Sequence, residues 1–241
     1  MEALTKPEFC KSLWLLAWKI NTMEQREKIF YKVILTVMGI TIISIGLTFM
    51  RYAVLGLDPA SCLNTGVSKK LGISFGTWAL ILYSIMLIGM FIFDRSKIGF
   101  GTLYNLITVG YTSDFLLWII NKIAIFESFS IQIRIISFIA GILILYFGAA
   151  IYIVTNMGLG PYDAIAVIIS DKIKRPNWFK WIRIGTDGLC VLGGILTQSD
   201  VGVGTLITVL FAGPLIAFYK KLIIKLKIFQ IITYVMPQNK I

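Results

Sequence analysis

The sequence predicts an all-α membrane protein of six transmembrane helices, arranged as two inverted repeats of three helices. The chain of 241 residues is 57% hydrophobic, with a mean hydropathy of +0.84, whereas soluble domains are about 45–50% apolar. Several apolar runs approach or exceed the roughly 20 residues that cross a bilayer. A duplicated glycine–proline pattern and a one-sided distribution of positive charge predict how the helices are arranged.

The duplication consists of two blocks of motifs. Residues Gly39, Gly46 and Gly56-Leu57-x-Pro59 are followed 102 residues later by Gly141, Gly148 and Gly158-Leu159-x-Pro161. The second block, Gly99-x-Gly101-Thr102, is followed 103 residues later by Gly202-x-Gly204-Thr205. Internal duplications of this length are typical of membrane transporters.

The first repeat is expected over residues 31–121. Its first span covers about 31–54 and ends at the Gly-Leu-x-Pro motif, because glycine and proline break a helix. Residues 60–74 are too polar and too short to cross, so they predict a partly inserted or surface helix. The second span covers about 75–93, and the third begins at the Gly-x-Gly-Thr motif and ends near residue 121.

The second repeat is expected over residues 132–226 and has the same plan. A fourth span covers about 132–156 and is again followed by a break and an amphipathic segment, 162–174. The fifth span, about 178–197, is the least apolar of the six. The sixth begins at the second Gly-x-Gly-Thr motif.

The two ends are expected to lie outside the repeats. Residues 1–30 predict a cytoplasmic extension, either an interfacial helix or a disordered segment. Met23 precedes a polar run typical of a translation start, so whether residues 1–22 are native stays open. Residues 227–241 predict a cytoplasmic tail at the membrane interface.

The charge distribution predicts the orientation. Cytoplasmic loops carry an excess of lysine and arginine. If the N-terminus is inside, the outer segments hold only Arg51, Lys69, Lys70, Lys122 and Arg134 of the 23 basic residues. Both termini are therefore expected in the cytoplasm. Three spans per repeat is an odd number, so the second repeat starts on the opposite side and the repeats are inverted.

The motifs resemble those of the YitT/YczE family of bacterial membrane proteins, in its YczE-like branch without a soluble C-terminal domain. The resemblance implies a multi-pass protein of the bacterial inner membrane and supplies no substrate. It covers about residues 30–226, through Gly56-Leu57-Asp58-Pro59, Ile73-Ser74-Phe75-Gly76-Thr77-Trp78, Ile98-Gly99-Phe100-Gly101-Thr102-Leu103-Tyr104-Asn105, Gly158-Leu159-Gly160-Pro161-Tyr162-Asp163 and Gly202-Val203-Gly204-Thr205-Leu206.

Composition argues against an enzyme. The absence of histidine excludes histidine metal sites and Ser–His or Cys–His catalysis. The three cysteines are too far apart in sequence for a zinc motif or a disulfide framework. We therefore expect no catalytic residue, metal or cofactor. The net charge of +11 is explained by membrane topology rather than by nucleic-acid binding.

The candidate solute- or ion-binding residues lie in the fifth span and at the two breaks. Asp187 falls near the middle of the fifth span, with Arg183 one turn earlier. They predict either an ion-coupling carboxylate or a pair that merely neutralises itself. Asp163 follows Gly160-Pro161 and could bind solute or cap the next helix. Asp58 and Pro59 lie in the equivalent break, although the two acids are not at matched positions.

Further polar candidates lie at the starts of the third and sixth spans. Thr102 and Thr205 are expected to cap these helices, whose N–H groups attract carboxylates or phosphates. Asn105 could line a polar path. Arg51 is expected to extend toward the outer headgroups, and Asp114 is a weaker candidate.

Together these features predict a transporter that moves a small polar or anionic metabolite by alternating access between the repeats, with Asp187 available for proton coupling. Two alternatives stay open. One is a non-transporting accessory protein that docks a membrane-associated enzyme assembly through its basic inner face. The other is the substrate-binding subunit of a vitamin importer. The expected partners are the lipid bilayer and an unknown small solute, and a homo-oligomer or a membrane-enzyme partner stays open.

Overall fold

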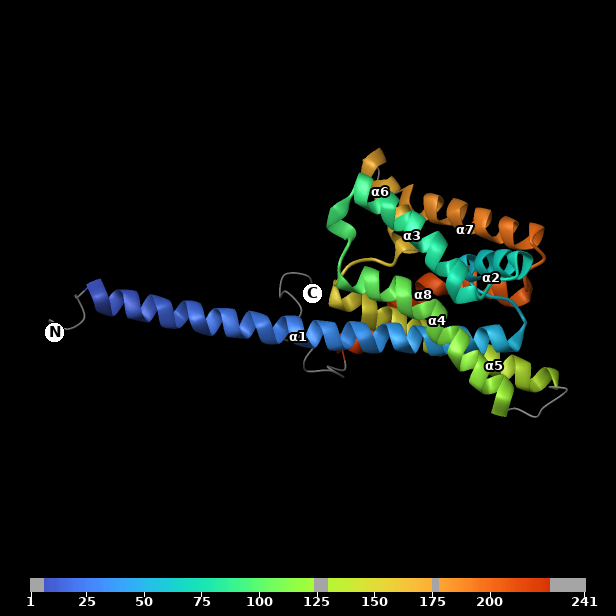
Figure 1. The fold of residues 1–241 in the computed structure, drawn as a ribbon, viewed down its shortest axis with the longest axis horizontal. Coiled ribbons are helices and arrows are strands. Elements are labelled where there is room, and N and C mark those ends of the chain that lie inside the picture. The colour runs from blue at the N-terminus through green and yellow to red at the C-terminus, as the bar shows by residue number, and fades with distance from the viewer. Residues whose placement is uncertain (1–6, 124–129, 175–177, 226–241) are drawn as a thin grey trace.

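The fold comes from a computed structural model that describes residues 7–123, 130–174 and 178–225, with side chains from residue 25 onward except that of Ile123. Helices joined by short non-helical turns make up these ranges. Figure 1 shows the helices in chain order. They are α1 (Pro7–Ala53), α2 (Pro59–Leu71), α3 (Phe75–Phe93), the short 3-10 helix η2 (Arg95–Lys97), α4 (Phe100–Ile123), α5 (Ile131–Thr155), α6 (Pro161–Ile173), α7 (Phe179–Leu196) and α8 (Val203–Lys225).

Five of these helices are long and apolar enough to cross a membrane: Gln25–Ala53 within α1, Phe75–Phe93, Phe100–Lys122, Ile131–Thr155 and Val203–Lys225. The prediction of an all-helical membrane protein is therefore confirmed. The predicted fifth span, α7, is not among the five. It contains Lys180, Arg183 and Asp187 within 18 residues, and intramembrane charge is costly.

From Pro7 the N-terminal extension is helical and continues without a break into the first span, so the disordered alternative is wrong over the part described. The placement of this helix at the membrane interface stays a prediction. At 1.5 Å per residue, a helix of 47 residues is about 70 Å long. Figure 1 shows its first half projecting beyond the bundle. The predicted tail, 227–241, lies outside the described residues.

The centre of the bundle is an antiparallel pair, α1 and α5, that meets through glycines. A Cβ on Gly46 would come within 2.4 Å of the Leu145 amide nitrogen and 2.7 Å of the Gly141 carbonyl oxygen. A Cβ on Gly39 would lie 3.0 Å from the Gly148 carbonyl oxygen. Glycines therefore let the two backbones touch, as they do between helices in lipid.

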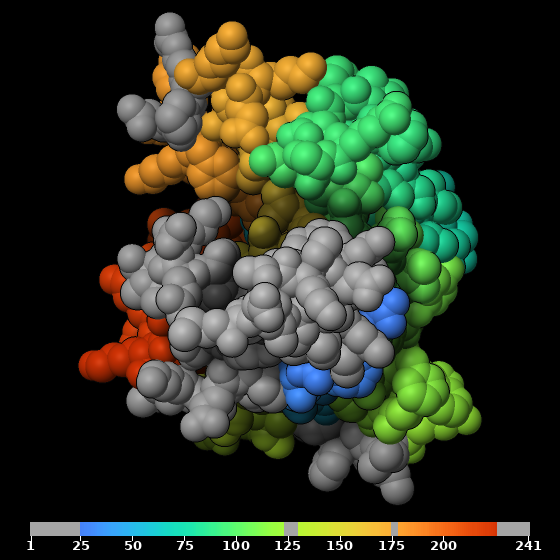
Figure 2. Space-filling model, turned by 90° about the vertical axis from the view of Figure 1, so that its left-hand side faces the viewer, coloured from blue at the N-terminus to red at the C-terminus, as the bar shows by residue number. Residues whose placement is uncertain are grey.

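The other helices lie in two layers, the first packed on this pair and the second on one side of it (Figure 1). In the first layer, α4 packs on α1 and α8 packs on α5. In the second, α2 packs on α7 and α3 packs on α6. Figure 2 shows the end of α3 beside the α6–α7 region. The layers are joined unequally: α3 packs on α4, but α7 and α8 hardly touch within the described ranges.

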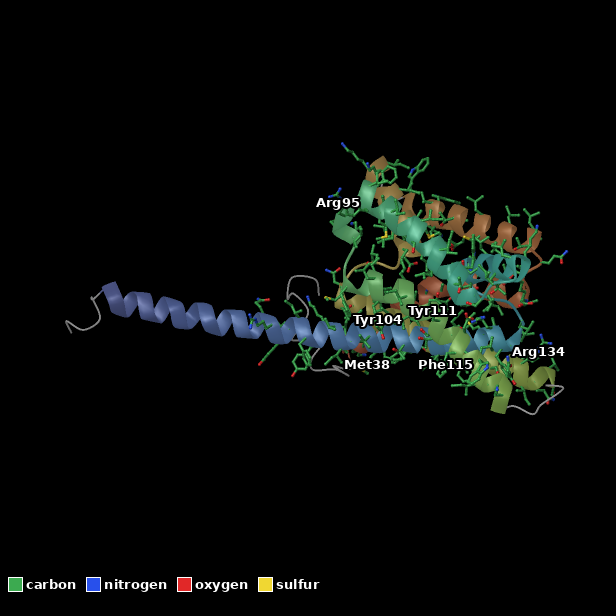
Figure 3. All side chains as sticks on the ribbon, in the orientation of Figure 1. Met38, Arg95, Tyr104, Tyr111, Phe115 and Arg134 are labelled. Atoms are coloured by element: carbon green, nitrogen blue, oxygen red, sulfur yellow. The ribbon has the colours of Figure 1, made fainter. Side chains whose placement is uncertain are left out.

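The outer surface is apolar, as a lipid-facing surface must be. Met38 on α1 and Tyr111 and Phe115 on α4 are all exposed. Figure 3 shows these three side chains along one side of the bundle. Exposed aromatic and aliphatic side chains on long helices are stable only against lipid or another protein.

The two predicted breaks are present, and each docks on a helix of the other repeat. Gly56 and Gly158 have positive φ angles of 129° and 108°, a region that glycine occupies readily. Just before them, the Leu55 carbonyl accepts from the Gly204 N–H (3.0 Å), and the Met157 carbonyl accepts from the Gly101 N–H (2.8 Å). The breaks therefore rest on the starts of α8 and α4.

Thr205 and Thr102 hold the breaks in place. The Thr205 hydroxyl accepts from the Leu57 N–H (3.2 Å). The Thr102 hydroxyl donates to the Leu159 carbonyl (2.8 Å) and accepts from the Gly99 N–H (3.2 Å). Both threonines are buried. Their hydroxyls are thus engaged with backbone, and their predicted role in solute binding stays a prediction.

Candidate functional site

Arg183 links two carboxylates from neighbouring helices. Its Nη1 lies 2.6 Å from Asp163 Oδ1 on α6 and its Nε lies 3.2 Å from Asp187 Oδ1 on α7. The i,i+4 spacing predicted the pairing with Asp187, and the ion pair is present. Tyr162, also on α6, donates its hydroxyl to Asp187 and places its ring 4.7 Å from the Arg183 guanidinium carbon. These four side chains join α6 to α7.

Asp163 therefore forms an ion pair rather than a helix cap. The N-cap of α6 is Gly160, which has no side-chain cap, and Pro161 occupies the first turn. Asp163 lies in that first turn, where a negative charge also favours the helix dipole. Asp163 accepts no hydrogen bond from an N–H of the first turn of α6 in the described structure, so the capping alternative is wrong.

Asp58, at the other break, caps its helix. Its Oδ1 accepts from the Ser61 N–H (3.1 Å), and Pro59 begins α2. Asp58 also lies close enough to Arg183 and Asp187 to interact with them electrostatically. Asp163 thus contacts this stretch of α7 through Arg183, and Asp58 lies within electrostatic range of the same stretch.

Three tyrosines complete this group, which we name the central cluster: Asp58, Asp163, Arg183, Asp187, Tyr83, Tyr146 and Tyr162. Tyr146 of α5 is near all four charged members, and Tyr83 of α3 is near Asp58 and Asp163. The fully buried Asn64 of α2 donates its amide to the Tyr83 hydroxyl (3.2 Å).

Sequence reasoning did not find Asn64, Tyr83 or Tyr146. A polar Asn64 in the segment after the break was visible, but nothing in its spacing indicated which helix it would face.

The polar residues one turn into α4 and α8 lie beside the breaks. A Cβ on Gly160 would lie 3.8 Å from Asn105 Oδ1 and 3.4 Å from Asp163 Oδ2. Thr208, which the repeat matches with Asn105, donates to the Leu57 carbonyl (3.3 Å). Asn105 is thus placed next to the central cluster, as the polar-path prediction requires.

Two ion pairs at the far ends of α2 and α6 were not predicted. Lys69 Nζ lies 2.8 Å from Asp200 Oδ2, and Lys97 Nζ lies 3.1 Å from Asp171 Oδ2. The repeat shifts match Lys69 with Asp171 and Asp200 with Lys97. The two pairs, named the Lys69–Asp200 latch and the Lys97–Asp171 latch, therefore occupy equivalent positions with their charges exchanged. The repeat shifts show that the two pairs are equivalent, but the contacts themselves are known only from the structure.

A third ion pair has no equivalent in the second repeat. Arg51 Nη1 lies 2.9 Å from Asp114 Oδ1, and Asp114 Oδ2 accepts from the Gly76 N–H (2.7 Å). Arg51 does not extend to the headgroups as expected, because its charge is neutralised inside the bundle. The pair ties α1, α3 and α4 together. The matching residues are Ile153 and Ala217, which fits the lack of packing between α7 and α8.

An open cavity of 660 Å³ lies between α5 and α8, away from the central cluster. Its lining is apolar apart from Asp200. A polar solute needs several placed hydrogen-bonding groups, so this cavity does not suit one. Within the described residues, the central cluster offers such groups instead.

Comparison with known proteins gives the family. Residues 30–221, which include the central cluster and both latches, match the model of DUF6198, a family of unknown function. The chain belongs to this family. The Bacillus subtilis "Uncharacterized protein YyaS" is 31% identical over 77% of this chain and 90% of its own length.

Two further relatives extend the match. The B. subtilis "Uncharacterized membrane protein YczE" is 22% identical over 75% of this chain and 81% of its own length. An "Uncharacterized protein" of Haemophilus influenzae is 26% identical over 81% of this chain and 87% of its own length. The predicted likeness to YczE is confirmed, whereas the YitT part of that family name stays a prediction. No solved structure matches the chain.

Proposed function

We propose that the protein is a transporter of the bacterial inner membrane that moves a small polar solute by alternating access between two inverted three-helix repeats. In this arrangement both termini lie in the cytoplasm and α7 crosses the membrane as the fifth of six spans. The observation that supports the proposal most directly is the pair of latches. One chemical contact occurs twice, once at the end of α2 and once at the end of α6, with its two charges exchanged.

The inverted arrangement is supported by contacts that the repeat shifts convert into one another. The Gly39–Gly148 contact becomes Gly141–Gly46, and both are present. The Leu55–Gly204 hydrogen bond becomes Met157–Gly101, and both are present. A two-fold axis between the repeats would relate all of these contacts at once, as in many transporters.

The latches are suited to opening in turn. Exposed ion pairs contribute only roughly 0–1 kcal/mol, and Lys69 and Asp171 are each more than half exposed. Releasing the Lys69–Asp200 latch would let α2 move away from the loop between α7 and α8. Releasing the other would let α6 move away from η2. Because α2 and α6 begin at the central cluster, each movement would expose it to one side.

The geometry narrows the predicted solute. The prediction included anionic metabolites, with Arg183 among the binding residues. Arg183 is already bonded to two carboxylates, and an anion would also face Asp58. We therefore keep the polar solute and drop the anionic one from the proposal.

Accessibility labelling tests this mechanism without a known solute. Cys190 is buried and lies near Asp58 and Asp187, so it can report opening in a protein with Cys10→Ser and Cys62→Ser. With an impermeant maleimide, Lys69→Glu is expected to increase labelling of Cys190 from one face of the membrane. Asp171→Lys is expected to increase it from the other face.

The matched control is Lys70→Glu, which makes the same charge change at the neighbouring exposed lysine. It is expected to leave labelling unchanged. The double variant Lys69→Asp/Asp200→Lys, which copies the charge order of the other latch, should restore the low labelling. Labelling from the same face in both latch variants would contradict alternating access.

A further inference from the structure

The charges of the central cluster define a class of solute. We infer that the protein binds a small organic cation, a protonated amine, against Asp58. This inference rests on the proposed function, because it names the substrate class of the same site. The predicted solute is thereby narrowed from polar molecules in general to molecules that carry an ammonium group.

The charged groups of the central cluster do not balance. The cluster holds three carboxylates, Asp58, Asp163 and Asp187, and one guanidinium, Arg183. The N-termini of α2 and α6 begin here, and a helix N-terminus acts as about half a positive charge. The sum is about one negative charge in excess. The cluster is partly open, since the Asp163 side chain is 53% and the Arg183 side chain 31% exposed. A monovalent cation that enters it would pair with the excess negative charge.

The excess negative charge is located at Asp58. The guanidinium of Arg183 is within hydrogen-bonding distance of the other two acids, and Asp187 also accepts from Tyr162. Asp58 accepts from Ser61 and has no ion-pair partner among the described residues. It is the acid that a bound cation would neutralise.

A second, independent observation lies on the same helix. Asn64 is 0% exposed and its Oδ1 has no hydrogen-bond partner within the described structure. Its Nδ2 donates to the Tyr83 hydroxyl, which lies near Asp58. A buried carbonyl without a donor costs about 1–3 kcal/mol, so a ligand that supplies a donor would be favoured. An ammonium group carries up to three.

The surroundings favour an amine over a metal ion. Metal ions such as Ca²⁺ take six to eight oxygen ligands, and the part of the chain described holds no group of three or more Asp, Glu, Cys or His positioned for a metal. The cluster itself contains three tyrosines, and the Tyr162 ring already lies 4.7 Å from the Arg183 guanidinium carbon, as expected of aromatic rings that attract cations. One carboxylate, one carbonyl without a donor and nearby tyrosines match a protonated amine.

The test is thermal unfolding of the full-length protein in lipid nanodiscs. Methylammonium or butylammonium chloride replaces potassium chloride at constant total chloride, with sodium chloride as a third arm. We expect at least one alkylammonium ion to raise Tm saturably by several degrees, and sodium to have no effect. Asp58→Asn should abolish the response. Asn64→Leu should weaken the apparent affinity at least ten-fold, whereas Glu27→Gln, which changes an exposed acid on α1, should keep it.

Three results would overturn the inference: no saturable response of folded wild type to either alkylammonium ion, an equal response to sodium, or an unchanged response in Asp58→Asn. If Asp58→Asn does not fold, Asn64→Leu and Tyr83→Phe decide in its place. Failure here with the Cys190 labelling intact would leave alternating access standing. Amine binding together with Cys190 labelling from one face only would support the binding site but contradict the transport cycle.

Discussion

At the scale of single residues, Asp114 has the most consequential bonds outside the central cluster. It neutralises Arg51 and accepts the Gly76 N–H at the start of α3. Asp114→Ala would leave Arg51, whose side chain is 12% exposed, without its counter-ion. Breaking a buried pair from one side costs about 3–5 kcal/mol, and we expect about 3 kcal/mol here because Asp114 is partly exposed. Reversible unfolding in detergent measures it.

Two companion variants separate charge loss from lost packing. Arg51→Met/Asp114→Leu should recover most of the stability, because neither charge is then left alone. Asp94→Asn is the matched acid on the surface. Hydrogen bonds from Ser96 lower the pKa of Asp94, so it is ionised at neutral pH. Its replacement should have a much smaller effect than Asp114→Ala. A cost for Asp114→Ala as small as that of Asp94→Asn would contradict the role of the ion pair.

Residue spacing predicted only part of the central cluster. The i,i+4 rule found Arg183 and Asp187 because both lie on one helix. It could not find that Asp163 shares Arg183, since their contact depends on how the break turns α6 toward α7. Asp58 was identified as an acid at the break, but the lack of an ion-pair partner follows from tertiary structure. Contacts between distant segments are beyond what local spacing can show.

At the scale of elements, the glycine contact between α1 and α5 controls the distance between the two repeats. Gly46→Ala would place a methyl group 2.4 Å from the Leu145 amide nitrogen, so the helices must separate. Overpacking of this kind costs typically 1–3 kcal/mol, and we expect about 2 kcal/mol by unfolding in detergent. Gly89→Ala is the control, because a Cβ there has nothing within 4 Å.

The control should be neutral or slightly stabilising, since alanine favours a helix over glycine by about 1 kcal/mol. Equal effects of the two substitutions would show that helix propensity, not close packing, decides the outcome at Gly46.

Helix boundaries could be predicted where the sequence contains breakers. Glycine and proline placed the ends of α1 and α5 and the starts of α2 and α6 within a few residues. The long N-terminal helix was missed, although no glycine or proline lies between Pro7 and Gly39. A polar composition was interpreted there as an end of the helix, whereas a helix can continue through polar residues into water. At α7 the charged residues were interpreted as a binding site inside a span, although α7 is not among the helices apolar enough to be candidate spans.

At the scale of the whole molecule, the backbone contacts follow the repeat and the charges do not. The close glycine contacts between α1 and α5 and at the two breaks have their counterparts. Gly110 is an exception, because a Cβ there would lie 2.7 Å from Gly76, whereas its match Gly213 has nothing within 4 Å. The ion pairs instead exchange their charges at the latches and are present only once at Arg51–Asp114. The sequence pattern predicted the paired glycines because they must fit a shared backbone. It could not predict the ion pairs, since any charged partner of suitable reach can fill such a position.

The last prediction concerns the orientation of the repeats. Lys70 at the end of α2 and Lys172 near the end of α6 are equivalent by the repeat, and both are exposed. Inverted repeats place equivalent residues on opposite faces of the membrane, and the charge bias puts Lys70 outside. In a Cys10→Ser background, Lys70→Cys should react with an impermeant maleimide in intact cells. Lys172→Cys should react only after permeabilisation.

The remaining cysteines, Cys62 and Cys190, are buried and give the background, which the Cys10→Ser protein measures. Reaction of both introduced cysteines in intact cells would mean that the repeats are parallel, and the latches could not then face opposite sides. Reaction of Lys172→Cys alone would keep the inversion and reverse the orientation. The experiment thus separates the symmetry, which the exchanged contacts support, from the sidedness, which depends on lysine and arginine alone.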